Sequence, residues 1–111
     1  MYFLPEKLDE YVVSHSEGEP ELLKALTRET YQKVLQPIML SGPYQGRVLS
    51  IISKLIRPTT ILELGTFTGY STLCLAEGLQ SGGCVPTDEI RPDHGGCHAA
   101  GDRFRERLVR W

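Results

Sequence analysis

The chain has 111 residues, of which 41% are hydrophobic and 23% are charged; this composition is ordinary for one small globular domain and excludes disordered and fibrous classes. Its net charge of -2 provides no basic excess for nucleic acid or an anionic membrane, and no apolar run reaches the roughly 20 residues that span a bilayer. Three irregularly spaced cysteines and a start without a signal-peptide pattern predict a soluble, cytoplasmic protein.

Three helices are predicted in the first half of the chain. The first runs from Pro5 to about Ser14, and the second runs from Pro20 to Leu35, where Pro37 stops it. The third follows the sequence MLSGP and ends at Arg57-Pro58. Its apolar residues recur at helical spacing, so we expect one side of this helix to be buried. That side consists of Tyr44, Val48, Ile51, Ile52 and Leu55.

A strand, a tight loop and a helix follow in order. The sequence TTILEL is typical of a buried parallel strand, and it ends at the loop from Gly65 to Gly69. The sequence YSTLCLAEGL returns to helical spacing, and CVPTDEI is predicted to be a second strand. Together they form the opening of a βαβ unit. Pro86 fits a central strand poorly, because proline has no N–H to donate.

The last 21 residues differ from the rest of the chain. Residues 91–111 contain five Arg, no Lys and three acidic residues, whereas residues 1–90 contain seven basic and eleven acidic residues. Helical spacing is weak there, at Phe104, Leu108 and Trp111. We expect this tail to pack poorly, and we interpret it as an aberrant end that a frameshift or gene-calling error near residues 86–91 would explain.

The glycine loop is predicted to bind a ligand, because open α/β sheets bind ligands at the carboxyl ends of their strands. A phosphate-binding P-loop requires lysine after its second glycine, but Gly69 is followed by Tyr70 and Ser71. The dinucleotide pattern G-x-G-x-x-G requires glycine where Phe67 stands. Both nucleotide patterns are therefore disfavoured.

The remaining pattern, E-x-G-x-x-x-G, resembles the first motif of class I S-adenosylmethionine (SAM)-dependent methyltransferases. The stretch LELGTFTGYST is similar to L-E-[LI]-G-[TAV]-[FY]-[TCS]-G-Y-S of the cation-dependent O-methyltransferases of the caffeoyl-CoA and catechol type, and SGPYQGRVLSIISKLI resembles the preceding helix. The resemblance covers residues 1 to about 85. It implies an α/β fold, in which residues 1–58 are an amino-terminal helical region and residues 59–90 begin a truncated Rossmann-like SAM-binding domain.

The resemblance also implies the residues of a SAM pocket. SAM carries an ammonium, a carboxylate and a sulfonium but no phosphate, so its pocket needs no lysine. Glu89, 20 residues after Gly69, is predicted to bind the ribose hydroxyls, although the acidic Asp88 beside it departs from the family pattern. By resemblance, the methionine side of SAM is lined by Glu63, Gly65, Thr66, Phe67, Gly69, Tyr70 and Ser71 and closed by Met39 and Ser41.

Each candidate also has a structural interpretation. Phe67 and Tyr70 are aromatic residues of the kind that fill cores, and Glu63 suits a structural hydrogen bond or ion pair. Ser71 is an ordinary residue at a helix start, and Met39 is a common gap-filling residue. A zinc site is disfavoured because the spacing of Cys84, His94, Cys97 and His98 fits no common ligand pattern.

The resemblance implies methyl transfer from SAM to a small hydroxylated acceptor, catechol-like or phenolic. It further implies a magnesium-like divalent ion and a homodimer for the full-length family. The family's metal ligands have no matching positions here, so no catalytic or metal-binding residue is predicted. We expect the chain alone to bind SAM weakly or not at all and to transfer no methyl group. The alternative is a non-catalytic fragment or interaction module with a vestigial SAM loop.

Overall fold

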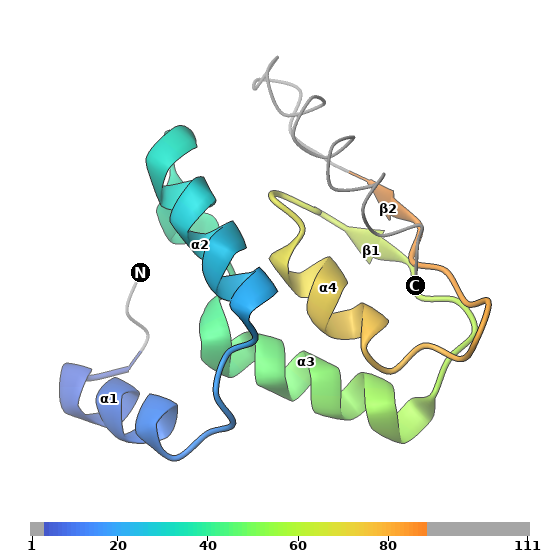
Figure 1. The fold of residues 1–111 in the computed structure, drawn as a ribbon, viewed down its shortest axis with the longest axis horizontal. Helices are drawn as coiled ribbons and strands as arrows, with labels where there is room; N and C mark the ends of the chain where they lie inside the picture. Colours follow the sequence, from blue (N-terminus) through green and yellow to red (C-terminus); the bar gives the residue numbers. More distant parts are fainter. Residues whose placement is uncertain (1–3, 89–111) are drawn as a thin grey trace.

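The computed structural model describes residues 4–88, which form helices followed by the start of a small parallel sheet (Figure 1). Glu89 and the predicted tail at residues 91–111 lie outside the described residues. The elements in chain order are α1 (Glu6–Ser14), α2 (Glu21–Lys33), the 3-10 turn η1 (Pro37–Met39), α3 (Gly42–Ile56), β1 (Glu63–Leu64), α4 (Tyr70–Ala76) and β2 (Thr87–Asp88).

Prolines set the starts of the first two helices. Pro5 and Pro20 are the N-cap residues of α1 and α2, with φ of -55° and -57° and extended ψ, so each helix begins one residue later than predicted. Helix α2 ends two residues before the predicted Leu35, because Val34 already has an extended backbone. Leu35 is consequently exposed rather than part of an apolar helical side.

The two strands pair in parallel, with Glu63 opposite Thr87 and Leu64 opposite Asp88. An isolated bridge between Thr60 and Cys84 extends the pairing toward the start of the predicted strands. Pro86 is accommodated because only its carbonyl is used: the Glu63 N–H donates to the Pro86 oxygen at 3.0 Å. Since α4 lies between β1 and β2 in the sequence, the predicted opening of a βαβ unit is confirmed.

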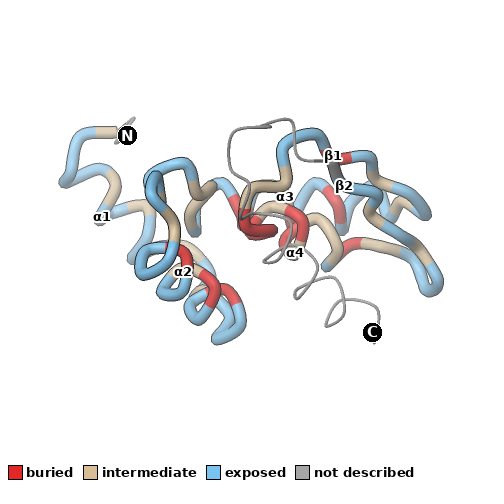
Figure 2. Tube along the Cα trace, turned by 90° about the horizontal axis from the view of Figure 1, so that it is seen from above, coloured by how far each residue is buried: buried red, intermediate tan, exposed pale blue. Residues whose placement is uncertain are grey.

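The core joins the helical region to this unit. Leu23 and Leu26 of α2 are buried together with Tyr70 and Cys74 of α4. Partly buried leucines pack around them: Leu40, Leu49 and Leu73. Figure 2 shows the buried residues gathered on α2 and where α3 meets α4. The short α4 is therefore held from two directions.

Helix α3 buries the side opposite to the predicted one. Its apolar residues Tyr44, Val48, Ile51, Ile52 and Leu55 are between 40% and 80% exposed, so the prediction that they are buried was wrong. The residues buried instead are Gly46, Arg47, Ser50 and Ser53.

The close approach of α3 and α4 explains why the side of α3 with small residues is buried. A Cβ atom at Gly46 would lie 2.7 Å from Tyr70 Cε1, and one at Gly78, just after α4, would lie 2.2 Å from the carbonyl carbon of Ser53. Only small side chains permit backbones to come so close, whereas the larger apolar residues of α3 would hold the helices apart. The Ser53 hydroxyl also donates to the Leu75 carbonyl oxygen at 2.6 Å.

None of the described helices is both long enough and apolar enough to cross a membrane.

Candidate functional site

The loop from Gly65 to Gly69 connects β1 to α4 as predicted, and α4 begins at Tyr70. Three of its residues have left-handed backbone conformations: Gly65 with φ of 88°, Phe67 with φ of 51° and Gly69 with φ of 92°. Glycine adopts such angles freely, but for Phe67 this conformation is unfavourable by about 1 to 3 kcal/mol. The Gly69 N–H donates to the Thr66 carbonyl oxygen at 2.9 Å and closes the turn.

The loop faces an open hollow of about 230 Å³. Seven of the ten predicted site residues line it, namely Met39, Ser41, Gly65, Thr66, Phe67, Tyr70 and Ser71. Met39 is the last residue of η1 and Ser41 is the N-cap residue of α3, so two parts of the chain form the walls.

Leu40 also lines the hollow, although the sequence did not single it out. Only its position between the two predicted residues Met39 and Ser41 could have indicated that Leu40 lies in the site. Gly69 does not line the hollow and acts instead as the N-cap residue of α4.

Glu63 lies next to the hollow rather than in its lining. The residue is only 8% exposed, and its carboxylate accepts hydrogen bonds from the Ser71 hydroxyl at 2.5 Å and from the Thr72 hydroxyl. Because Ser71 lines the hollow, Glu63 is connected to it through one side chain. Thr72 was not predicted as a site residue. Only its position next to Ser71, in the first turn of α4, could have indicated its role.

Two side chains from the amino-terminal part of the chain contact the loop and the first residue of α4. Thr30 of α2 and Thr68 of the loop are both buried, and their hydroxyl oxygens are hydrogen-bonded at 3.0 Å. The Tyr70 hydroxyl donates to a carboxylate oxygen of Glu19 at 2.5 Å. Burial and then this hydrogen bond raise the pKa of Tyr70, so the phenol stays protonated as a donor. Thr30 and Glu19 were not predicted as site residues.

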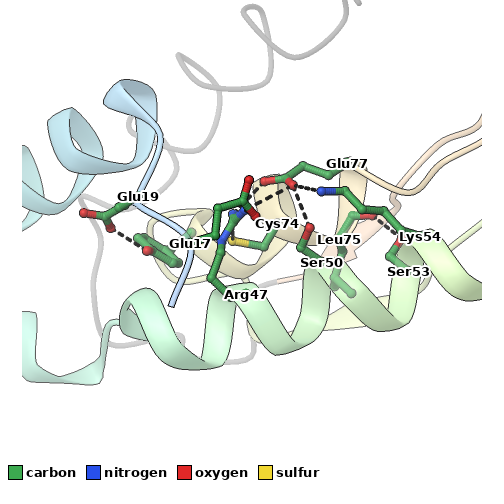
Figure 3. A network of polar contacts seen from close by, with 10 residues as sticks. Glu17, Glu19, Arg47, Ser50, Ser53, Lys54, Cys74, Leu75 and Glu77 are labelled. Carbon is green, nitrogen blue, oxygen red and sulfur yellow. Dashed lines mark hydrogen bonds and ion pairs between the residues drawn. The ribbon is translucent and has the colours of Figure 1, made fainter. Parts of the chain in front are cut away.

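A second polar group joins α3 to α4 away from the hollow (Figure 3). The Arg47 side chain is 9% exposed, and its guanidinium contacts Glu77 at 2.7 Å. Lys54 lies 2.8 Å from the same carboxylate, and the Ser50 hydroxyl donates to it at 2.6 Å. Burial alone would raise the pKa of Glu77, but the hydrogen bonds from Arg47, Lys54 and Ser50 lower it to about 2.

Within residues 4–88, no cluster of three or more His, Cys, Asp or Glu side chains is arranged to hold a metal ion. The metal implied by the resemblance thus has no ligand set among these residues. Cys84 is exposed, while the other members of the disfavoured zinc set, His94, Cys97 and His98, lie outside the described range.

The fold and motif have counterparts in known proteins. The family model for O-methyltransferases matches residues 13–100. A catechol O-methyltransferase of Niastella koreensis is 35% identical over 89 residues, which are 80% of this chain and 40% of that protein. The structure of the Podospora anserina methyltransferase PaMTH1 bound to SAH matches with a TM-score of 0.80 and 25% identity, over 96% of this chain and 45% of the other.

The O-methyltransferase TomG of Streptomyces achromogenes, involved in tomaymycin synthesis and solved in complex with SAM, matches with a TM-score of 0.69 and 31% identity. This match covers 93% of the present chain and 45% of TomG. The chain thus spans less than half the length of these relatives.

Proposed function

This chain belongs to the O-methyltransferase family, and on that premise we propose that its glycine loop binds the methionine part of SAM. We further propose that the protein uses SAM to methylate a hydroxyl group of a small catechol-like or phenolic acceptor. The observation that carries the proposal is the convergence of seven predicted SAM-binding residues on one hollow. The catechol O-methyltransferase relative supports the acceptor class, and the SAH-bound and SAM-bound neighbours support the cofactor.

The lining of the hollow suits the chemistry of SAM. Its described lining residues include no Lys or Arg, and they offer the hydroxyls of Ser41, Thr66 and Ser71 together with loop backbone. The Thr66 hydroxyl oxygen is buried without a hydrogen-bond partner among the described residues, and a polar ligand group would satisfy it after a small loop adjustment. These groups match the ammonium and carboxylate of a methionine moiety.

The described residues have distinct roles in this proposal. SAM supplies an electrophilic methyl group on its sulfonium. Ser71 would orient the methionine end, because Glu63 fixes the Ser71 hydroxyl from behind. Phe67, Met39 and Leu40 would cover the apolar parts of the ligand and exclude water. Activation of the acceptor hydroxyl is not assigned to any described residue. Magnesium dependence, ribose binding by Glu89 and homodimerisation stay predictions.

The alternative function, a non-catalytic interaction module, is favoured by one observation. The apolar side of α3, formed by Tyr44, Val48, Ile51, Ile52 and Leu55, is exposed, and contiguous exposed apolar patches often mark interaction sites. Binding of SAM or SAH at the glycine loop distinguishes the two functions.

The test is a titration of SAH into the isotope-labelled chain, followed by NMR. We expect saturable shifts of the amide signals of Gly65, Thr66 and Ser71, with an affinity in the high micromolar to millimolar range. Ser71→Ala should weaken binding on the order of tenfold, because one hydrogen bond is lost. Ser14→Ala, on exposed α1, is the matched control and should change nothing. An unchanged wild-type spectrum at several millimolar SAH would refute the binding proposal.

Methyl transfer is tested separately, with SAM, a catechol and magnesium. The expectation that the chain alone transfers no methyl group stays a prediction. Turnover that is lost on Glu63→Ala would contradict it.

A further inference from the structure

We infer that Thr30 and Glu19 are positioning residues: their hydrogen bonds to Thr68 and Tyr70 hold the glycine loop in its ligand-binding shape. The inference rests on the proposed function only for the identity of the ligand. The order of the loop is a property of the chain itself and can be measured without any ligand.

The first contact anchors the loop to α2. Thr30 is 2% exposed, and its hydroxyl lies 2.8 Å from the Leu26 carbonyl oxygen and 3.0 Å from the Thr68 hydroxyl. A carbonyl oxygen can only accept, so the single Thr30 proton is directed to Leu26 and the Thr68 hydroxyl donates to Thr30. Both hydroxyls are buried, and removing either one leaves the other without this partner.

The second contact anchors the start of α4. The Tyr70 ring is buried against α3, where a Cβ atom at Gly46 would be 2.7 Å from its Cε1. Its hydroxyl donates to Glu19, which lies in the connection just before α2. Lateral movement of the ring is therefore limited by α3, and its end is fixed by Glu19.

The two contacts enclose the part of the loop that needs support. Thr68 and Tyr70 are the immediate neighbours of Gly69, whose φ is 92°, and Phe67 precedes them with its unfavourable φ of 51°. Such a conformation persists only where surrounding structure enforces it. Thr30 and Glu19 are 38 and 51 residues away in sequence from their partners, so this support comes from outside the strand–loop–helix unit.

A purely structural role predicts a different result from a positioning role. If Thr30 and Glu19 only stabilised the whole fold, their replacement would promote opening everywhere to a similar extent. If they position the loop, replacement would increase opening of the loop more than opening of the sheet. Amide hydrogen exchange separates these cases, because it reports local opening residue by residue.

The experiment compares exchange of two amides in the unliganded chain: Gly69 N–H, bonded to Thr66, and Glu63 N–H, bonded to Pro86. Thr30→Val should accelerate Gly69 exchange on the order of tenfold and leave Glu63 exchange nearly unchanged. Thr27→Val is the matched control on the same helix, since the Thr27 hydroxyl has no hydrogen-bond partner among the described residues. Thr30→Ser, which keeps the hydroxyl, should restore slow exchange.

Glu19→Gln and Glu19→Ala supply a second, independent set of variants if Thr30→Val does not fold. Glu19→Ala should accelerate exchange near Tyr70, and Glu19→Gln, which keeps an acceptor oxygen, should have a smaller effect. Glu17→Ala is the control, because Glu17 is largely exposed and its ion pair with the Arg47 guanidinium is long, at 3.8 Å. Equal acceleration at Gly69 and Glu63, or no acceleration in any variant, would overturn the inference.

Titration of SAH into the same variants keeps the two proposals distinguishable. Thr30→Val should weaken SAH binding by a factor similar to its effect on Gly69 exchange. Loop-specific acceleration in a chain that binds no SAH would support the positioning role and refute the SAM proposal. SAH binding that is equal in wild type, Thr30→Val and Glu19→Ala would refute the positioning role alone.

Discussion

Arg47 and Glu77 are charged residues at the closest contact between two helices. A buried charge is costly unless it is paired and hydrogen-bonded, and Arg47 meets that condition by contacting both Glu77 oxygens, at 2.7 Å and 3.3 Å. Lys54 and Ser50 complete the group around the carboxylate. Ionised Glu77 therefore stabilises the burial of the polar side of α3.

Acid is expected to weaken this contact within a defined pH range. A carboxylate whose pKa is lowered on folding stabilises the fold above its ordinary pKa, and the stabilisation is lost as pH falls through the folded value. For Glu77 the range runs from the ordinary value of 4.5 down to about 2. Glu77→Gln should reduce the free energy of unfolding at pH 7 by about 1 to 3 kcal/mol and should lose stability less steeply in this range.

Urea unfolding at several pH values between 2 and 7 measures both effects. Glu21→Gln is the control, because Glu21 is fully exposed and its pair with Lys24 contributes little to stability. An identical acid dependence in the wild type and Glu77→Gln would show that Glu77 does not control the acid response.

At the scale of elements, α3 shows what periodicity can and cannot predict. The helix itself and its end near Arg57 were predicted, because apolar residues recur every three or four positions. The buried side was not predicted correctly, because periodicity identifies an apolar side without identifying the neighbour that each side meets. The determining feature was the set of small residues Gly46, Ser50 and Ser53, which permits close approach to α4.

Because the apolar side of α3 is exposed, replacing its large residues should cost little stability, whereas replacing apolar residues in the core should cost much. Ile51→Lys with Leu55→Lys should change the free energy of unfolding by no more than about 0.5 kcal/mol, because both side chains are mostly exposed. The same double variant should reduce the fluorescence of an apolar dye bound to the protein, since the patch is interrupted. Leu26→Ala in the core of α2 is the contrasting variant and should cost about 2 to 5 kcal/mol.

A large loss of stability in the double lysine variant would contradict the exposure of this side. Unchanged dye binding would show that the dye binds elsewhere.

At the scale of the whole molecule, the core crosses the boundary between the helical region and the strand–loop–helix unit. Leu23 and Leu26 come from residues 1–58, and Tyr70 and Cys74 come from residues 59–90. The proposed division at that boundary stays a prediction, but the two parts share one hydrophobic cluster. This sharing is why Thr30 and Glu19 can reach the glycine loop.

Most of the candidate site was accessible from the sequence, because its residues lie in one continuous motif and one short preceding segment. Thr30 and Glu19 were not accessible, since their relation to the loop exists only after α2 packs against α4. Glu63 was predicted to line the SAM pocket, with a structural hydrogen bond as the alternative. Its carboxylate accepts hydrogen bonds from Ser71 and Thr72, and contact between Glu63 and a ligand stays a prediction. Local motifs predict which residues gather, and long-range packing determines how they are oriented.

The thiol of Cys74 provides a chemical measure of this packing. Cys74 is 0% exposed between α3 and α4, and burial raises its pKa, so little reactive thiolate forms while the helices are in contact. Cys84, in contrast, is exposed. In a Cys84→Ser, Cys97→Ser variant, an alkylating reagent should react with Cys74 only when the helices part. When closing is faster than labelling, the rate should rise about tenfold for each 1.4 kcal/mol by which a substitution such as Glu77→Gln favours the open form. Rapid labelling of Cys74 at neutral pH would contradict the closed contact, and slow labelling would let the reaction time of one sulfur atom report the fraction of time for which α3 and α4 are apart.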